Sequence, residues 1–255
     1  MEEVRFLGLT TNDAYMNMAT DESIMLAMKA GNVPPTLRFY RWNPSAVSIG
    51  TFQGMTEEVD LDFCNSQEID YIRRITGGGA VYHDFDGEIT YSIILPKGHR
   101  LAPDDIIESY RLLCGGVVKA LEHLGIVAEF KPINDVIAGG KKVSGNAQTR
   151  RHLCVLQHGT ILLDLDVETM FSVLKVPQEK ISDKMIADVK ERVTSVRDLL
   201  NRAVPFDELS EALEVGFSKA LGIDLVLGDL TTEETQTAAR LRSERYSQDE
   251  WNLRR

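Results

Sequence analysis

Three consecutive glycines, Gly77-Gly78-Gly79, constrain the fold of this chain more than any other stretch. An apolar, extended run from Tyr71 to Ile75 precedes them, and a second run from Ala80 to His83 follows. Because glycine is a poor residue for the interior of a helix, this arrangement predicts a strand, a loop and a second strand. A loop without side chains allows its backbone to approach a bound molecule closely.

Two arginines, Arg73 and Arg74, stand just before the glycine loop. Guanidinium groups beside exposed backbone N–H groups favour an anionic ligand, so the stretch indicates a binding site for a carboxylate or a phosphate. The alternative is a flexible turn with two solvated arginines. The loop alone does not decide between these two interpretations.

Length and charge exclude several classes of protein. The chain has 255 residues, enough for one large domain or two small ones, and it carries 28 Lys and Arg against 39 Asp and Glu, a formal net charge of −11. This acidic balance argues against general nucleic-acid binding. No apolar run reaches the length of about 18 residues that a membrane-spanning helix needs.

The three cysteines, Cys64, Cys114 and Cys154, are scattered and odd in number. They form neither the spacing of a zinc site nor an obvious disulfide pair, which predicts reduced thiols in a cytoplasmic protein. The first residues, beginning Met1-Glu2-Glu3, do not resemble a secretory signal.

Hydrophobic periodicity predicts an α+β fold with a central, mixed and largely antiparallel sheet flanked by helices. We expect strands at residues 4–9, 37–42, 46–50, 69–75, 80–83, 88–95 and 126–130, and helices at 14–30, 59–67, 104–124, 206–221 and 231–246. Asp21 and Glu22, in the middle of the first helix, are expected to be solvated, and the alternative is that one of them faces a polar site near the core. The charged run from Glu179 to Arg192 is expected at the surface.

A second glycine-rich stretch lies at Gly139-Gly140, which predicts a hairpin turn two residues before Lys142. If the hairpin faces the glycine loop, backbone N–H groups and a lysine ammonium would hold one phosphate together. That arrangement suits the attack of a carboxylate on the α-phosphate of ATP. The glycine spacing matches neither the phosphate-binding loop nor the dinucleotide-binding motif.

Four motifs in order carry a resemblance to a known family: residues 73–84, Asn134-Asp135-Val136, Gly140 to Gln148, and 157–160. The chain resembles the lipoate–protein ligase family, within the group of biotin and lipoate ligases and octanoyltransferases, nearly from end to end. The resemblance implies the biotin/lipoate ligase catalytic-domain fold, with residues 1–255 as a single catalytic domain. The chain departs from full-length ligases in one respect: it stops soon after Trp251, so we expect their C-terminal accessory domain to be absent.

This family resemblance implies a two-step reaction. Lipoate and ATP form lipoyl-adenylate, and the lipoyl group then moves to a lysine of an acceptor protein. The implied cofactors are ATP, lipoate and Mg²⁺, although no carboxylate cluster marks ligands for the metal. The implied partners are the lipoyl domain of a 2-oxoacid dehydrogenase or the glycine cleavage H protein, with a separate accessory polypeptide as a further possibility.

Lys142 matches the active-site lysine of the family, whereas its neighbour Lys141 is expected to be solvated. The other positions that match the family's binding site are Arg74, Thr76, Gly77, Gly78, Gly79, Ala80, Val81, Tyr82, His83, Asn134, Asp135, Gly145, Ala147 and His158. For the two histidines a role in the core is an equal alternative, and for Asn134 and Asp135 a role in a turn. Candidate walls for the acyl chain are Val47, Ile49, Ala80, Val81 and Ala147.

The alternative within the group is an octanoyltransferase, which transfers octanoyl from an acyl carrier protein through a cysteine and needs no ATP. One branch carries its cysteine in the loop before the lysine hairpin, and here Lys131 to Asp135 contain none. Another branch places it three residues before the histidine–glycine pair, whereas Cys154 lies four before His158 and so faces the other side of a strand. We therefore expect a ligase. Lys142 and the glycine loop also argue against a non-enzymatic lipoyl-binding protein.

Overall fold

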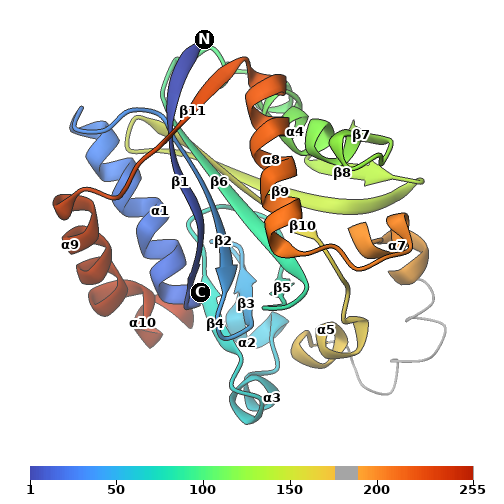
Figure 1. Ribbon diagram of the computed structural model, residues 1–255. Coiled ribbons are helices and arrows are strands. Elements are labelled where there is room, and N and C mark those ends of the chain that lie inside the picture. Colours follow the sequence, from blue (N-terminus) through green and yellow to red (C-terminus); the bar gives the residue numbers. More distant parts are fainter. Residues whose placement is uncertain (176–188, 255) are drawn as a thin grey trace.

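A computed structural model describes residues 1–175 and 189–254 (Figure 1). Its main sheet has eight strands, in the order β11 (Ile223–Leu227), β1 (Glu2–Asn12), β2 (Thr36–Trp42), β6 (Glu88–Pro96), β10 (Cys154–Leu162), β9 (Lys141–Arg151), β8 (Asp135–Ala138) and β7 (Ala128–Lys131). The pairs β11–β1 and β1–β2 are parallel, and the remaining pairs are antiparallel. The predicted α+β fold with a mixed, largely antiparallel sheet is confirmed.

A second, smaller sheet carries the glycine loop. It consists of β4 (Asp70–Arg73), β3 (Ala46–Ile49) and β5 (Val81–His83), in that order. The glycine stretch connects β4 to β5, as the sequence predicts, but the two strands pair with β3 between them and not with each other. The loop therefore spans a neighbouring strand instead of closing a tight hairpin.

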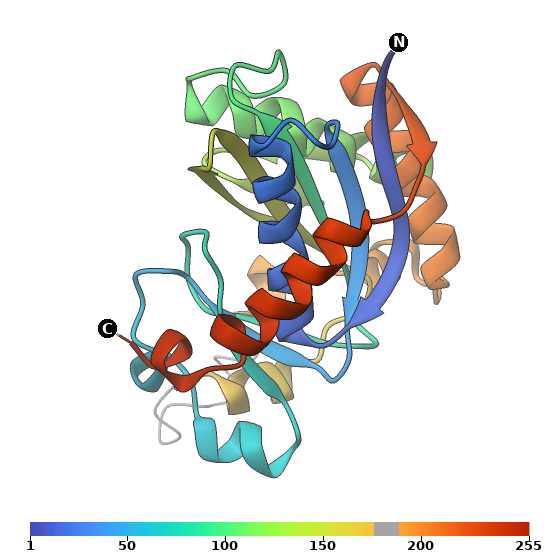
Figure 2. The same cartoon turned by 90° about the vertical axis from the view of Figure 1, so that its left-hand side faces the viewer.

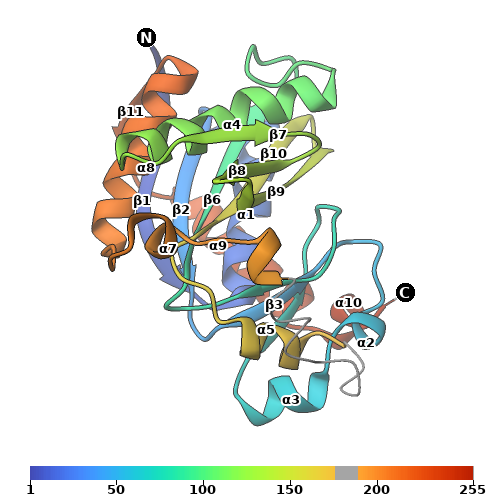
Figure 3. The ribbon, with the colours of Figure 1, turned by 90° about the vertical axis from the view of Figure 1, so that its right-hand side faces the viewer.

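Helices cover both faces of the main sheet (Figures 1, 2 and 3). On one face α4 (Ile106–His123) and α8 (Phe206–Leu221) pack against Leu37, Phe39 and Tyr91. On the other face α1 (Ala14–Lys29) and α9 (Thr232–Leu241) pack against residues such as Tyr40 and Trp42. The alternation of side chains along β2 therefore divides the hydrophobic core into two layers.

The remaining helices are short: α2 (Met55–Glu58), α3 (Leu61–Ser66), α5 (Val167–Val173), α7 (Val196–Leu200), η2 (Arg242–Tyr246) and α10 (Asp249–Asn252). The helix expected at 231–246 is α-helical only to Leu241 and continues as the π-helical turn η2. Among the described residues, no helix combines the length and the apolar composition that crossing a membrane requires.

The prediction that Asp21 and Glu22 are solvated is wrong, since both are buried. Helix α1 lies between the main sheet and α9, so neither of its sides is left to solvent. Asp21 accepts hydrogen bonds from Arg38 and Ser92, and Glu22 accepts one from Tyr246. Residues 179–188 of the predicted charged surface run lie outside the described residues.

Arg73 has a structural role, although the sequence places it beside Arg74 in front of the glycine loop. Its side chain is fully buried and donates to the carbonyl oxygens of Trp251 and Asn252 at 3.0 Å, and to that of Gln53 at 2.5 Å. It thereby ties the C-terminal residues to the small sheet and does not contribute to the lining of the pocket described below.

Candidate active site

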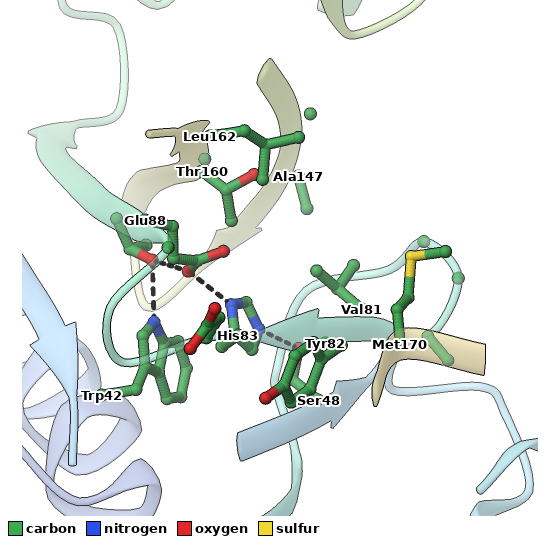
Figure 4. A pocket seen from close by; sticks show the side chains of 18 of the residues that line it. Trp42, Ser48, Val81, Tyr82, His83, Glu88, Ala147, Thr160, Leu162 and Met170 are labelled. Carbon is green, nitrogen blue, oxygen red and sulfur yellow. Dashed lines mark hydrogen bonds and ion pairs between the residues drawn. The ribbon is translucent and has the colours of Figure 1, made fainter. Parts of the chain in front are cut away.

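A pocket of about 280 Å³ lies between the main sheet and the small sheet (Figure 4). Strands β6, β9 and β10 contribute to it from the main sheet, and β3, β5 and the glycine loop from the small sheet. Twelve of the predicted site residues line it: Arg74, Gly78, Gly79, Ala80, Val81, Tyr82, His83, Asn134, Lys142, Gly145, Ala147 and His158. The hairpin lysine and the glycine loop therefore line the same cavity.

The other predicted residues lie just behind this lining. Thr76 is buried against His158, and Asp135 contacts Lys142. Gly77 is held through its carbonyl oxygen by Arg74. The predicted acyl walls Val47 and Ile49 belong to the core of the small sheet and do not line the cavity.

Arg74 fixes the shape of the glycine loop. Its guanidinium is buried and donates to the carbonyl oxygens of Gly77 at 2.8 Å, Gly79 at 2.7 Å and Ser48 at 3.1 Å. Burial lowers the pKa of Arg74 to about 10, so the group stays charged at neutral pH. The loop also packs tightly on β3, because a Cβ atom on Gly50 would lie 2.1 Å from the carbonyl oxygen of Gly78.

The same guanidinium orients His83. Arg74 Nη1 donates to Ser48 Oγ at 3.0 Å, and Ser48 Oγ lies 2.8 Å from His83 Nε2. Because Ser48 already accepts a hydrogen from Arg74, its own hydroxyl hydrogen is available to Nε2. His83 Nδ1 then carries the hydrogen that it donates to Glu88 Oε1 at 2.7 Å. These hydrogen-bond partners assign the tautomer of His83.

A second branch from Arg74 orients His158 in the same way. Arg74 Nε donates to Thr76 Oγ1 at 3.1 Å, and Thr76 Oγ1 lies 2.8 Å from His158 Nε2. His158 Nδ1 faces Asp21 Oδ2 at 3.6 Å, too far for a hydrogen bond. One buried arginine therefore sets the orientation of both histidines that line the pocket.

Burial controls the charge states of this histidine and its neighbour. It lowers the pKa of His158 below its ordinary value, although Asp21 favours the protonated form. Burial alone would raise the pKa of Asp21, but Arg38, His158 and Ser92 together hold it below its ordinary value. At neutral pH a neutral imidazole therefore lines the pocket, and the charged carboxylate of Asp21 lies behind it.

Sequence reasoning missed the polar residues around His83. The Trp42 ring stacks on the His83 ring with 4.0 Å between centroids, and Trp42 Nε1 donates to Thr90 Oγ1 at 2.8 Å. Thr90 in turn donates to Glu88 Oε1 at 2.8 Å (Figure 4). Within the described residues Glu88 Oε2 has no hydrogen-bond partner. An acid at the start of a strand without any other charged residue was the signal that could have revealed this cluster.

Lys142 reaches the pocket from an irregular part of strand β9. The pairing of β8 with β9 shifts between Val136 and Ile137, which inserts an extra residue beside Lys142. Its Nζ atom lies 2.7 Å from Asp135 Oδ1, but the contact lacks the geometry of a directed hydrogen bond. Gly145 makes room for the lysine, because a Cβ atom there would lie 2.8 Å from Nζ.

The three cysteines are buried outside the pocket. Burial raises the pKa of Cys64 and of Cys114 to about 12, and it also raises the pKa of Cys154. Cys154 packs in the core beside α1 and donates to the carbonyl oxygen of His152. A thiol that is protonated and enclosed is a poor nucleophile. In residues 1–175 and 189–254 no cluster of His, Cys, Asp or Glu could hold a metal ion.

Residues 13–218 match the family described as the lipoyl protein ligase A/B catalytic domain. The chain belongs to this family. The match covers the glycine loop, the lysine hairpin and both histidines, so the predicted family is confirmed on the residues that suggested it.

Curated relatives of this lipoyl protein ligase A/B domain are octanoyltransferases. The chain is 39% identical to octanoyltransferase LipM of Kyrpidia tusciae, and the alignment covers 100% of both chains. It is 32% identical to octanoyltransferase LipM of Bacillus subtilis, with 100% of this chain and 99% of the relative covered.

Solved structures of lipoate ligases share its fold. The bipartite lipoate protein ligase of Thermoplasma acidophilum superimposes with a TM-score of 0.86 at 36% identity, over 99% of this chain and 96% of that one. A lipoate-protein ligase A bound with ATP superimposes with a TM-score of 0.83 at 36% identity, over 99% of both chains. The predicted lipoate ligase catalytic-domain fold is confirmed.

The predicted ATP-dependent ligase activity is wrong, because the curated relatives that match from end to end are named octanoyltransferases. The predicted cofactors ATP, lipoate and Mg²⁺ are corrected with it. The fold does not distinguish the two reactions, since ligases share it. The alternative reaction, the transfer of an octanoyl group, is the one that these relatives favour.

Proposed function

We propose that this chain is an acyltransferase of protein lipoylation, which moves an octanoyl group from a carrier-bound thioester to a lysine of an acceptor protein. The observation that carries the proposal is that the Lys142 ammonium and the glycine loop held by Arg74 line one cavity. The names of the end-to-end relatives indicate the octanoyl group, and the family resemblance implies an acyl carrier protein as its donor.

The enclosed cysteines favour direct transfer over an acyl-cysteine intermediate. The uncharged amine of the acceptor lysine attacks the thioester carbonyl carbon and forms the amide C–N bond. The C–S bond breaks, and the carrier thiolate leaves with the proton that the amine loses. The Lys142 ammonium would stabilise the negative charge that develops on the carbonyl oxygen, because it is a cation beside an apolar cavity.

The pocket lining suits an alkyl chain. Val81, Ala147, Leu162 and Met170 supply apolar surface around the polar cluster (Figure 4). Each methylene that leaves water contributes roughly 0.8 kcal/mol, so burial of the chain would supply several kcal/mol of binding free energy. This energy would hold the thioester in position for the attack.

We propose the lipoyl domain of a 2-oxoacid dehydrogenase or the glycine cleavage H protein as the acceptor, as the family resemblance implies. Three free, buried cysteines fit a reducing compartment, so we propose the cytoplasm. The assignment of residues 1–255 to one catalytic domain stays a prediction, and so does the need for an accessory polypeptide. The roles of the individual site residues are proposals as well.

The test compares two acyl sources with the same acceptor. The purified full chain is incubated with a lipoyl domain and either octanoyl carrier protein, or octanoate or lipoate with ATP and Mg²⁺. Intact-mass measurement of the acceptor should show one added octanoyl group with the carrier alone. An acceptor whose target lysine is changed to arginine serves as the matched control and should gain no mass.

Two results would overturn this proposal. The first is a mass gain only with the free acid and ATP, which would mean that the chain activates its own acyl group. The second is no gain from either source, with or without other proteins of the lipoylation pathway.

A further inference from the structure

Three arginines from separate parts of the chain gather on one side of the molecule. They are Arg151 at the end of β9, Arg245 in η2 and Arg254 near the C-terminus. Figures 2 and 3, seen from opposite sides, both place the turn between β9 and β10, the glycine loop and the C-terminus on this side. The ring of Trp251 lies between two of the guanidiniums, 5.1 Å from that of Arg245 and 3.7 Å from that of Arg254.

Arg151 joins the group through its neighbour in the turn. His152 Nε2 lies 3.6 Å from Glu22 Oε1, and Arg245 Nη1 lies 2.7 Å from the same oxygen. Burial lowers the pKa of Arg254, and the positive charges of Arg151 and Arg245 lower it further.

Of the three arginines, only Arg245 pairs with a carboxylate of residues 1–175 and 189–254. Glu22, which is buried, pairs with Arg245. In the described part of the chain no ion pair joins Arg151 or Arg254 to an acidic residue. On a protein with a formal net charge of −11, Arg151 and Arg254 are therefore two arginines without an ion-pair partner in that part of the chain, next to the exposed Asp249 and Glu250 of α10.

Short contacts connect the cluster to the pocket. Arg254 Nη2 lies 3.5 Å from Thr51 Oγ1, and the Thr51 N–H donates to the carbonyl oxygen of Thr76 at 2.9 Å. Thr76 leads directly into the glycine loop, whose Gly78 and Gly79 line the pocket. Next to Thr51, the Phe52 side chain is 90% exposed, which is unusual for a large aromatic residue on a monomer.

We infer that Arg151, Arg245, Arg254 and Phe52 form the docking surface for the acidic acyl carrier protein that delivers the octanoyl thioester. This inference rests on the proposed function. Acyl carrier proteins are acidic and present their thioester on an arm that contains a phosphate. Guanidiniums bind both carboxylates and phosphates through paired hydrogen bonds. A basic surface that adjoins the glycine loop would steer such a partner to the pocket.

The test reverses two charges and leaves the fold intact. Arg151→Glu and Arg254→Glu are combined, while Arg245 is kept because its pair with Glu22 joins η2 to α1. The KM for octanoyl carrier protein should rise about tenfold or more, as is typical when complementary charges at an interface are reversed. The KM for octanoyl-pantetheine, a small thioester without a protein, should stay within about twofold. Phe52→Ser should raise the KM for the carrier to a lesser extent.

Lys219→Glu is the matched control. Lys219 is exposed in α8, which lies on the opposite side of the molecule from the C-terminus in Figures 2 and 3. This variant should leave the KM for the carrier unchanged. Titration calorimetry with octanoyl carrier protein gives a readout besides activity. The affinity of the carrier for the double variant should fall by the same factor as the KM rises. This affinity should also depend much less on salt concentration.

An unchanged KM and affinity for the carrier would overturn the inference. So would a rise in KM for the lipoyl domain alone, which would assign the surface to the acceptor. An equal loss with the carrier and with octanoyl-pantetheine would show damage to the pocket and would also overturn it. Failure of the proposed function looks different, since the unaltered chain would then use neither thioester.

Discussion

The two walls of the pocket are built in contrasting ways. On the glycine-loop wall, Arg74 is buried and donates to three backbone carbonyl oxygens and two hydroxyl groups. On the hairpin wall, Lys142 is 40% exposed and has one contact with a carboxylate, that of Asp135, which is itself partly exposed. Two cationic side chains thus line one cavity. Arg74 is held by hydrogen bonds from all its N–H groups, whereas Lys142 is held by a single ion pair.

This difference separates two tasks. A guanidinium with every hydrogen committed to the protein has none left for a ligand, so Arg74 shapes the loop and orients the histidines. An ammonium held by one charge contact can exchange Asp135 for a ligand oxygen at little cost, since exposed ion pairs contribute about 0–1 kcal/mol. We therefore assign a structural role to Arg74 and a catalytic role to Lys142. The following variants test this assignment.

Arg74→Met should have the largest effect and should reduce both stability and activity. The variant removes the charged donor to the carbonyl oxygens of Ser48, Gly77 and Gly79, and a hydrogen bond to a charged group contributes about 1.5–3 kcal/mol, so we expect a loss of about 3 kcal/mol or more in the free energy of unfolding. Urea denaturation measures it. Arg202→Met, which removes an exposed pair with Glu208, is the control and should leave the transition unchanged.

A stable Arg74→Met protein that has lost its activity would contradict this assignment, because Arg74 would then act on the ligand. The orientation of the histidines gives a second readout. Nitrogen NMR shifts of His83 and His158 should show both rings protonated at Nδ1 in the unaltered chain, and mixed tautomers in Arg74→Lys.

Lys142→Ala should give the opposite pattern. Its stability should change by less than about 1 kcal/mol, since the side chain is partly exposed. The kcat for octanoyl transfer should fall about 10²–10³-fold, as is usual when one group that stabilises an oxyanion is removed. Lys141→Ala is the matched control. The Lys141 ammonium donates to the carbonyl oxygen of Lys190, so this variant should retain full activity. Equal activity of the two variants would exclude Lys142 from the chemistry.

His158 should make stability depend on pH by a smaller amount. Its folded-state pKa lies below the ordinary value of 6.5, so the unfolded chain takes up the proton first as the pH falls. The free energy of unfolding should therefore decrease below about pH 6.5, by at most about 1.4 kcal/mol per pH unit, until the folded protein is protonated as well. The contribution of Asp21 is lost only below its ordinary value of 3.8, in a separate window.

Urea denaturation at a series of pH values, with His158→Gln as the comparison, checks this expectation. The variant should show a flatter profile between pH 6.5 and the folded-state pKa. An identical slope in both proteins would assign the dependence to another group.

The sequence predicted the features that depend on neighbours along the chain. The glycine loop between two strands and the turn before Lys142 follow from local composition, and the structure has both. The partners of Arg74 did not follow, because Ser48 and Thr76 belong to different segments that only the small sheet brings together.

The sequence did not predict the burial of Asp21 and Glu22, for a similar reason. A short stretch of helix does not reveal that its outer side will be covered, and the residues that cover it, Arg245 and Tyr246, come more than 200 positions later. The reaction was misassigned because no cysteine lies where the two transferase branches carry theirs, and because the loop and the lysine suit any activated acyl group. The pattern of residues does not encode whether that group arrives as a free acid or as a thioester.

Cys154→Ala should have the smallest effect on activity. The variant tests whether a cysteine thiol outside the pocket carries the acyl group during transfer. The thiol is buried beside α1 with a raised pKa, and it does not line the pocket. The rate of octanoyl transfer should therefore stay within about twofold, with a loss of stability of about 1 kcal/mol from the missing sulfur. After incubation with octanoyl carrier protein alone, intact-mass measurement should show no octanoyl group on the chain. A stable adduct that disappears in Cys154→Ala would mean that strand β10 rearranges to expose the thiol, and the direct attack of the acceptor lysine would then give way to a two-step transfer.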